Sequence, residues 1–575
     1  MEENWMTTPK RLSGMPLLHW LSAALLAPVL LSATTGQAEQ HLTLTSHVPR
    51  AVVNGQAPRV GELPSIQRLS LAISLPLRNQ TDLDDLLRQL YDPQSPNYRE
   101  YLSVEEFTRR FGPTQDDHAA VIGFAEVNGL TVTETFANRL VVDVEGPVAS
   151  IEKAFHVTMG VYQHPTENRT FYAPDREPTL DLETPVLHIS GLDNFTLPQA
   201  KNIKPSRASD GGSKATGSGP NGQFIGSDMR AAYNASGLLC GVAPAPCDGT
   251  GQSVGLLEFA GYEISDVELY FNSLNQPLNV NNVVPRSVNG VPLDCPPPQC
   301  DDFEQALDIE MALSMAPESQ VVVYVGSIDA SIFNAMATDK PTSQQLSCSW
   351  GWADDESSLD LIFMEFAAQG QTVFVATGDS GSSTKANVVW PADDPYVTAV
   401  GGTDLTTNGP GGPWESETGW SGSAGMPSKN KVAIPWYQQL AGVINFSNGG
   451  STTLRNIPDV AAEADTNQYS CYDGSCSGGN GGTSYAAPQW AGFIALVNQQ
   501  AVQCTAVPNT AVGFLNPALY QIGVGSQYPS DFYDITSGSN GKYSAVTGYD
   551  LVTGWGSLNG PNLVPDLVKA LIGCN

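Results

Sequence analysis

The serine with the most suggestive chemical context is Ser484, in the stretch Gly481-Gly482-Thr483-Ser484-Tyr485-Ala486-Ala487-Pro488. This glycine-rich turn runs directly into an apolar pattern with helical spacing, from Trp490 to Val497. A serine in such a place stands at a helix N-terminus, where free N–H groups and the helix dipole favour a nearby oxyanion. The same spacing fits an ordinary Ser or Thr helix cap, so spacing alone leaves a nucleophile and a cap equally open.

The distribution of histidine restricts which group could activate that serine. All seven histidines precede the low-complexity stretch that begins at Lys204: His19, His41, His47, His118, His156, His164 and His188. The region beyond that stretch therefore cannot build a Ser-His-Asp triad from its own residues. The segment Gly378-Asp379-Ser380-Gly381-Ser382 looks like the nucleophile segment of chymotrypsin-like proteases. That interpretation is disfavoured because no histidine is available and the surrounding pattern is not that of a double β-barrel.

A pair of carboxyl groups could replace histidine as the base. In the helical pattern from Asp302 to Ala312, Glu304 and Asp308 are four residues apart and share one helix face. Two carboxyls held close together cannot both ionise cheaply, so one keeps its proton at a raised pKa and can relay it. For an isolated pair, a solvated acidic helix face would be the simpler interpretation.

The elements around these residues predict two domains. Residues 65 to 195 alternate helix-like and strand-like runs, as a small α/β domain would. Beyond residue 220, apolar strand-like runs separated by amphipathic helices predict a mostly parallel, doubly wound α/β sheet. These runs are Ser253 to Phe259, Gln320 to Val325, Gln344 to Trp350, Thr372 to Ala376 and Tyr396 to Val400. The stretch 204–220, rich in Gly, Ser and Lys, is typical of a flexible linker that a protease can enter.

The N-terminus has the order of a secretory signal. Lys10 and Arg11 precede an apolar run at 17–31, and small residues follow up to Ala38, where cleavage is expected. A membrane anchor is the alternative, disfavoured because the run is short and contains Pro28. We therefore expect a secreted protein, extracellular or periplasmic, with no stable membrane association.

The charge of the chain limits the kinds of partner that it can bind. The formal net charge of -32 argues against nucleic acid as a partner, because phosphate binding needs a basic face. The acidic balance fits either solubility or adaptation to acid, where a chain with few Lys and Arg residues avoids positive charge.

The nine cysteines of an exported chain favour disulfides over metal binding. Close pairs occur at Cys240 and Cys247, Cys295 and Cys300, and Cys471 and Cys476, with Cys504 and Cys574 as the expected long-range pair. This leaves Cys348 as a buried free thiol in a strand-like stretch, although the sequence does not fix the connectivity.

Together these motifs resemble the sedolisins, or serine-carboxyl peptidases. Gly482 to Pro488 resembles the family's nucleophile motif, Glu304 to Glu310 its catalytic helix, and Thr377 to Gly381 the segment with its oxyanion-hole aspartate. The resemblance implies a subtilisin-like catalytic domain at 221–575, a ferredoxin-like α+β pro-peptide at 39–203, a processing site within the linker 204–220, and a signal peptide at 1–38. It further implies that Ser484 is the nucleophile, Glu304 the general base, Asp308 its partner, and a protonated Asp379 the oxyanion donor.

The resemblance also implies a single structural Ca2+ ion near the C-terminus. Its ligands would be carboxylates of Asp534 and Asp550 and main-chain carbonyls of Ile535, Val546 and Gly548, hard oxygen donors that suit calcium. We expect a monomeric zymogen whose substrates are polypeptides and whose own pro-peptide inhibits it and assists its folding. Endopeptidase and tripeptidyl-peptidase action both stay open. A histidine-dependent subtilisin-like hydrolase and an inactive secreted binding protein on the same scaffold are the alternatives.

Overall fold

The apolar runs beyond the linker form one central sheet. In the computed structural model, which describes residues 42–204, 216–240, 245–298, 300–352, 357–382, 389–502 and 511–572, its strands are almost all parallel. Their order is β14 (Val283–Ser287), β15 (Gln320–Val325), β13 (Ser253–Glu258), β16 (Gln345–Cys348), β18 (Thr372–Ala376), β19 (Thr398–Thr407) and β20 (Trp414–Gly419). Only β20 is antiparallel to its neighbour, while β23 (Val460–Glu463) joins β19 in parallel. The predicted doubly wound sheet is confirmed.

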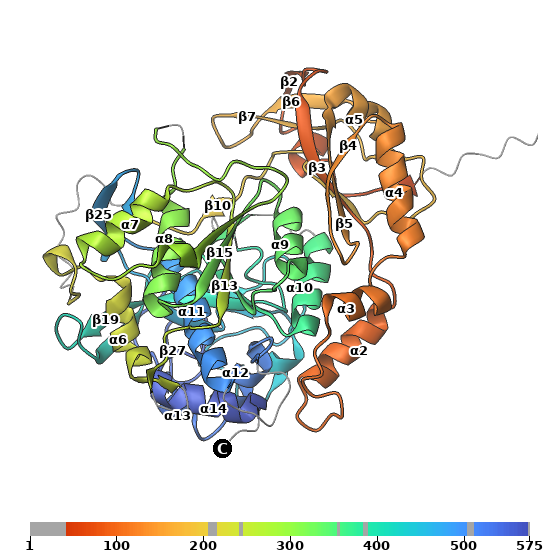
Figure 1. The fold of residues 1–575 in the computed structure, drawn as a ribbon. Coiled ribbons are helices and arrows are strands. Elements are labelled where there is room, and N and C mark those ends of the chain that lie inside the picture. Colours follow the sequence, from red (N-terminus) through yellow and green to blue (C-terminus); the bar gives the residue numbers. More distant parts are fainter. Residues whose placement is uncertain are drawn as a thin grey trace, which may run out of the picture. The chain divides into compact units, whose positions relative to one another are not determined.

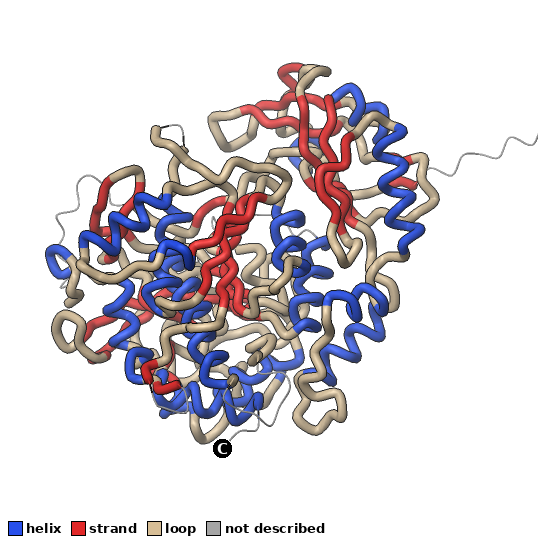
Figure 2. Tube along the Cα trace, viewed as in Figure 1, coloured by secondary structure: helices blue, strands red, loops and turns tan. Residues whose placement is uncertain are grey.

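Helices cover both faces of this sheet, which explains why its strands are apolar throughout. The chain passes from β13 through α7 (Ile264–Ser273) to the edge strand β14, returns through α8 (Phe303–Met315) to β15, and then crosses through α9 (Asp329–Thr338) to β16 on the other side of β13. Helices α9 and α10 (Ser357–Gln369) lie together, and α8 packs against α11 (Thr483–Ala501) apart from them, as Figures 1 and 2 show.

The pro-segment has the predicted ferredoxin-like topology. Its four-stranded antiparallel sheet has the order β4 (Thr131–Thr135), β5 (Val141–Pro147), β3 (Arg68–Ser74) and β9 (His188–Ser190). Helices α4 (Gln115–Val127) and α5 (Val148–Phe155) complete the β-α-β-β-α-β pattern and share an apolar cluster with the sheet. A second antiparallel sheet consists of β2 (Arg59–Glu62), β6 (Met159–Gln163) and β7 (Thr170–Pro174).

Pro-segment and catalytic region belong to one compact unit and share a buried polar contact. Strands β3 and β5 pack against α9, and helices α2 (Gln80–Leu90) and α3 (Val104–Arg110) pack against α10. Asn138 donates to Asn334 at 2.6 Å and to Glu365 at 2.7 Å, and Ser331 donates to Asp143 at 2.7 Å. The remaining elements include α6 (Gly226–Ala232), β24 (Gln468–Tyr472), β25 (Ser475–Asn480), α12 (Asn516–Gly523), α13 (Tyr528–Asp531) and α14 (Gly560–Ile572).

Three of the predicted cysteine pairs are disulfides, namely Cys240–Cys247, Cys295–Cys300 and Cys471–Cys476. Cys348 is a buried free thiol, as expected. The predicted signal peptide, most of the linker, and both Cys504 and Cys574 lie outside the described residues. Within the part of the chain that the structure describes, no helix combines the length and apolarity needed to cross a bilayer.

Candidate active site

The carboxyl ends of the central strands meet where the strand order reverses, between β13 and β16. Open α/β sheets bind ligands at this edge. Glu258 is the last residue of β13, Ser349 follows β16, and Asp379 lies shortly after β18. The N-terminal turns of α8 and α11, which pack against each other, bring Glu304 and Ser484 to the same place. The topology thus gathers residues that are far apart in sequence.

Ser484 is the second residue of α11 and is fully buried. Gly482, which precedes the helix, has a φ of 127°, a left-handed value that side chains rarely adopt. The chain can therefore turn sharply into the helix and place the serine in its first turn. The Ser484 hydroxyl donates to the carbonyl oxygen of Ser349 at 3.3 Å.

Glu304 and Asp308 lie on one buried face of α8, so they are not the solvated pair that an isolated motif would suggest. Burial raises the pKa of Glu304 well above its usual range, and the nearby Asp308 raises it further. Interaction with the Ser484 hydroxyl and with the amide of Asn202 opposes this rise, because both donors favour the charged carboxylate. Glu304 is therefore in contact with the serine it was expected to serve.

A third carboxyl group, Glu258, extends this cluster and was not anticipated from the sequence. Burial and the neighbouring Glu258 raise the pKa of Asp308, and burial and Glu304 raise that of Glu258. Trp350 donates its indole N–H to Glu258 at 3.0 Å, and the Ser349 hydroxyl donates to Asp308 at 2.8 Å. An acidic residue that ends an apolar strand was the available signal. The three carboxyls form one proton-sharing group.

Asp379 lies beside the first turn of α11. Its Oδ1 atom accepts hydrogen bonds from the N–H of Thr483 at 2.8 Å and from the Thr483 hydroxyl at 3.0 Å. Burial raises the pKa of Asp379 to about 7, although the Thr483 hydrogen bonds and the charge of Lys201 lower it. A Cβ atom added to Gly482 would lie 2.9 Å from Oδ2 of Asp379, which places that oxygen at the serine turn.

An extended segment of the pro-region, 199–204, crosses this site. Strand β10 (Gln199–Ala200) pairs antiparallel with β17 (Trp350–Gly351), and Ile203 forms a bridge with Gly481. A cavity of about 420 Å³ lies here, lined by Lys201, Thr377, Asp379, Val389 and Ala424 among others. No role for this segment was expected from the residues alone, because Lys201 lies just before the linker.

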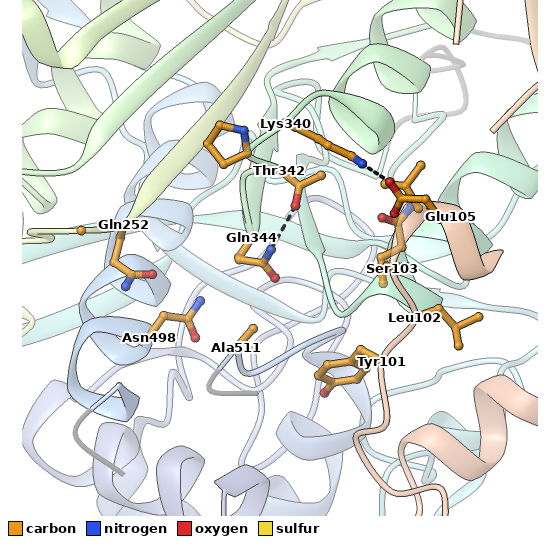
Figure 3. A pocket seen from close by; sticks show the side chains of 14 residues that line it. Tyr101, Leu102, Ser103, Glu105, Gln252, Lys340, Thr342, Gln344, Asn498 and Ala511 are labelled. Carbon is orange, nitrogen blue, oxygen red and sulfur yellow. Dashed lines mark hydrogen bonds and ion pairs between the residues drawn. The ribbon is translucent and has the colours of Figure 1, made fainter. Parts of the chain in front are cut away.

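A larger cavity of about 710 Å³ lies elsewhere and contains none of the predicted catalytic residues. Figure 3 shows its polar lining, with Lys340 paired with Glu105 and Gln344 hydrogen-bonded to Thr342. The smaller cavity is the candidate active site, because Asp379 lines it and the Ser484 N–H donates to the carbonyl of Lys201, another of its lining residues.

The predicted calcium ligands lie in one loop region near the C-terminus. The Gly548 N–H donates to Asp534 at 3.1 Å, and Asp550 accepts from the N–H groups of Val546 and Thr553 at 2.9 Å each. Burial raises the pKa of Asp550 to about 7 and also raises that of Asp534. Among the described residues, no cluster of three or more His, Cys, Asp or Glu side chains could hold a metal ion.

These features define a class of protein: a serine hydrolase with a subtilisin-like α/β fold and a pro-domain, whose serine lies beside carboxyl groups. Comparisons with known proteins agree. A family described as "Pro-kumamolisin, activation domain" matches residues 56–195, and the "Subtilase family" matches residues 308–513. Kumamolisin from Bacillus sp. (strain MN-32) is 31% identical over 92% of this chain and 97% of its own length. Sedolisin from Pseudomonas sp. (strain 101) is 27% identical over 89% of both chains.

Among solved structures, Pseudomonas sedolisin complexed with pseudo-iodotyrostatin matches 59% of this chain and 96% of its own, with 24% identity and a TM-score of 0.48. The extent of the match to kumamolisin establishes the family. The chain belongs to the sedolisin family of serine-carboxyl peptidases, and it is a serine-type peptidase that carries its own pro-domain.

Proposed function

We propose that this peptidase works in acid and hydrolyses peptide bonds through Ser484, Glu304 and Asp308. The observation that supports this most strongly is the contact of the Ser484 hydroxyl with a buried carboxyl cluster. The region from residue 205 onward contains no histidine that could act in its place. A carboxylate in contact with the serine is the base that the site offers.

In this mechanism Ser484 attacks the scissile carbonyl and passes its proton to Glu304, which then returns it to the leaving amine. Water hydrolyses the acyl-enzyme in a second round of the same proton transfers. Asp308 and Glu258 share the proton that Glu304 receives, because the three carboxyls lie together in a buried cluster. Such a group titrates as a unit, so a single base strength cannot be assigned to any one member.

Asp379 acts as an acid in its neutral form, donating a hydrogen bond to the tetrahedral oxyanion. Its Oδ1 atom is held by Thr483, which leaves Oδ2 to carry the proton. With a pKa raised to about 7 by burial, Asp379 is about 99% protonated at pH 5. The site is therefore suited to acid.

The test is cleavage of a quenched-fluorescence peptide library from pH 3 to pH 8, with products identified by mass spectrometry. We expect cleavage to persist below pH 5, and Ser484→Ala to abolish it. Ser380→Ala, the matched control at the other candidate serine, should retain activity. Cleavage that is fastest near neutral pH and vanishes below pH 5 would show that the proposed protonation states are wrong. The same digest distinguishes endopeptidase from tripeptidyl-peptidase action.

We further propose that the protein is secreted as a monomeric zymogen whose pro-domain occupies the active site and assists folding until it is cut in acid. The passage of segment 199–204 across the site supports inhibition. If the cut is autocatalytic, purified Ser484→Ala precursor stays intact on acidification. Normal processing of that variant, with no other protease present, would refute autocatalysis.

A structural Ca2+ ion is also proposed at the C-terminal loop. The donor set fits, because the carboxylates of Asp534 and Asp550 both lie near Tyr528. The Tyr528 hydroxyl donates to Asp534 at 2.8 Å, and both carboxylates raise the pKa of Tyr528. Neither carboxylate has a salt bridge to a cationic side chain among the described residues. The carboxylates of Asp534 and Asp550, with the carbonyls of Ile535, Val546 and Gly548, would hold the ion. Bound calcium would neutralise the charge of this loop and tie its two ends together.

A further inference from the structure

The geometry points to the Lys201–Asn202 peptide bond as the bond that this zymogen cuts first, with Lys201 in the specificity pocket. This inference rests on the proposed function and adds to it a scissile bond and a substrate class, namely peptides with a long basic residue on the acyl side. It moves the expected cut to just before the linker 204–220.

The segment around this bond is held as a bound peptide would be. Before the bond, Gln199 and Ala200 pair with Gly351 and Trp350 as an added antiparallel strand. The Lys201 N–H continues this pairing, donating to the Ser349 carbonyl at 2.9 Å. Main-chain pairing of this kind fixes an extended peptide regardless of its sequence.

On the other side of the bond, a second set of main-chain hydrogen bonds holds the chain. The Ile203 N–H donates to the Gly481 carbonyl at 2.7 Å, and the Gly481 N–H donates back to the Ile203 carbonyl at 3.1 Å. Main-chain hydrogen bonds therefore fix the chain on both sides of the Lys201–Asn202 peptide bond.

The Lys201 carbonyl lies at the position where an oxyanion would form. Its oxygen accepts a hydrogen bond from the backbone N–H of Ser484 at 3.0 Å. A Cβ atom added to Gly482 would lie 2.4 Å from this oxygen and 2.9 Å from Oδ2 of Asp379, so the two oxygens share one small space. The backbone N–H and a protonated Asp379 are the two donors that an oxyanion needs.

The nucleophile lies beside the same peptide. The Ser349 carbonyl oxygen accepts from both the Lys201 N–H, at 2.9 Å, and the Ser484 hydroxyl, at 3.3 Å. A shared acceptor keeps the hydroxyl next to the Lys201 backbone. On the leaving-group side, the side-chain amide of Asn202 donates to Glu304, the group proposed to return the proton to the departing amine.

The pocket around the Lys201 side chain explains why a long, unbranched residue fits. Lys201 is only 5% exposed. A Cβ atom at Gly351 would lie 2.5 Å from Cε of Lys201, and one at Gly378 would lie 3.6 Å from its Cδ. Glycine at 351 therefore provides the space for the end of the side chain.

The Lys201 side chain keeps its charge in acid. Burial lowers the pKa of Lys201 to about 8, and the nearby carboxyls of Asp379 and Glu304 oppose this fall when they are ionised. The ammonium group is thus still protonated in acid, where the enzyme is proposed to work.

The reaction balances without a further reactant. Ser484 Oγ adds to the Lys201 carbonyl carbon as its proton passes to Glu304. The C–N bond to Asn202 then breaks, and Glu304 returns the proton to the Asn202 amine. Water hydrolyses the Lys201 ester, which restores Ser484 and leaves a Lys201 carboxyl group and a catalytic domain that begins at Asn202.

The test uses the full-length precursor, purified at neutral pH and then acidified. Samples taken over time are analysed by intact mass and N-terminal sequencing, and digestion of an added denatured protein is followed in parallel. We expect the first new N-terminus at Asn202. Lys201→Arg should process at nearly the original rate, and Lys201→Glu at least about tenfold more slowly. Arg176→Ala, which loses an exposed ion pair with Asp175 in the pro-segment, is the control and should process normally.

A second measurement does not depend on folding of the variants. Processed enzyme is given the peptide Gln-Ala-Lys-Asn-Ile-Lys and its counterpart with Glu in the third position, and only the first should be cut after the third residue. If the added protein is digested but the first N-terminus lies elsewhere, or if both peptides are cut equally, the assignment of Lys201 is overturned while the proposed function stands. If neither the precursor nor the added protein is cut at any pH, the proposed function fails and this inference fails with it.

Discussion

Replacing Asp379 by Asn tests the central feature of the mechanism, a carboxylic acid that must be neutral to act. The amide has almost the same shape, and its oxygen can still accept from Thr483, as Oδ1 of Asp379 does at 2.8 Å and 3.0 Å. Its NH2 group then lies where Oδ2 carries the proton. The variant thus retains an oxyanion donor at every pH, whereas the wild-type donor exists only while Asp379 is protonated.

The magnitude follows from the pKa of Asp379, which burial raises to about 7 while the charge of Lys201 lowers it. Release of the pro-segment removes that charge but also admits water to the site, and these two changes move the pKa in opposite directions. Wild-type activity that depends on this proton should fall above about pH 7, by about tenfold for each pH unit. In Asp379→Asn this fall should disappear. Asp379→Ala, which has no donor, should lose about 10²- to 10³-fold in kcat at all pH values.

The assay is kcat/KM of processed enzyme on a quenched-fluorescence peptide from pH 3 to pH 9, with re-assay at pH 5 after each incubation to detect irreversible unfolding. If Asp379→Asn shows the same alkaline fall as the wild type, the proton on residue 379 does not control activity. If Asp379→Ala retains full activity in acid, Asp379 is not an oxyanion donor. Either result refutes the reasoning.

Three further predictions concern other carboxyl groups. Glu258→Gln retains an acceptor for Trp350 but removes a proton site. It should lower kcat more than it raises KM and shift the acid limb of the pH profile. An unchanged pH profile would show that Glu258 does not belong to the proton-sharing group. A calcium chelator should lower the Tm of the wild type, and Asp550→Ala should lower the Tm and abolish the chelator effect. If neither the chelator nor the substitution changes the Tm, the protein has no structural calcium ion at this loop. Asp143, whose pKa burial raises to about 7 in the folded protein, stabilises the fold fully below its unfolded pKa of about 4, and this contribution is lost as pH rises through 7. In the uncut Ser484→Ala precursor, Asp143→Asn should therefore reduce the fall in Tm between pH 4.5 and pH 8, by an amount on the order of 4 kcal/mol in unfolding free energy at most; an identical fall would show that Asp143 is not its source.

Much of the fold could be predicted because local patterns define it. The strands Gln320–Val325 and Thr372–Ala376 have the bounds that their apolar runs indicated. Strand β19 was harder to delimit: it begins at Thr398, two residues later than expected, and continues to Thr407. Its continuation pairs antiparallel with β20, a non-local contact that the run of side chains does not encode.

The sequence by itself determined the residue types of the site. It also excluded a histidine base from the region beyond residue 204, because no histidine occurs there. It could not decide whether Ser484 was a nucleophile or a helix cap, or whether Glu304 and Asp308 faced solvent. Only the tertiary structure showed that both carboxyls are buried and that Glu304 contacts Ser484, because burial depends on elements that are distant in sequence. The same holds for Glu258 and Lys201: each reaches the site through strand pairing, so no local motif marks either one.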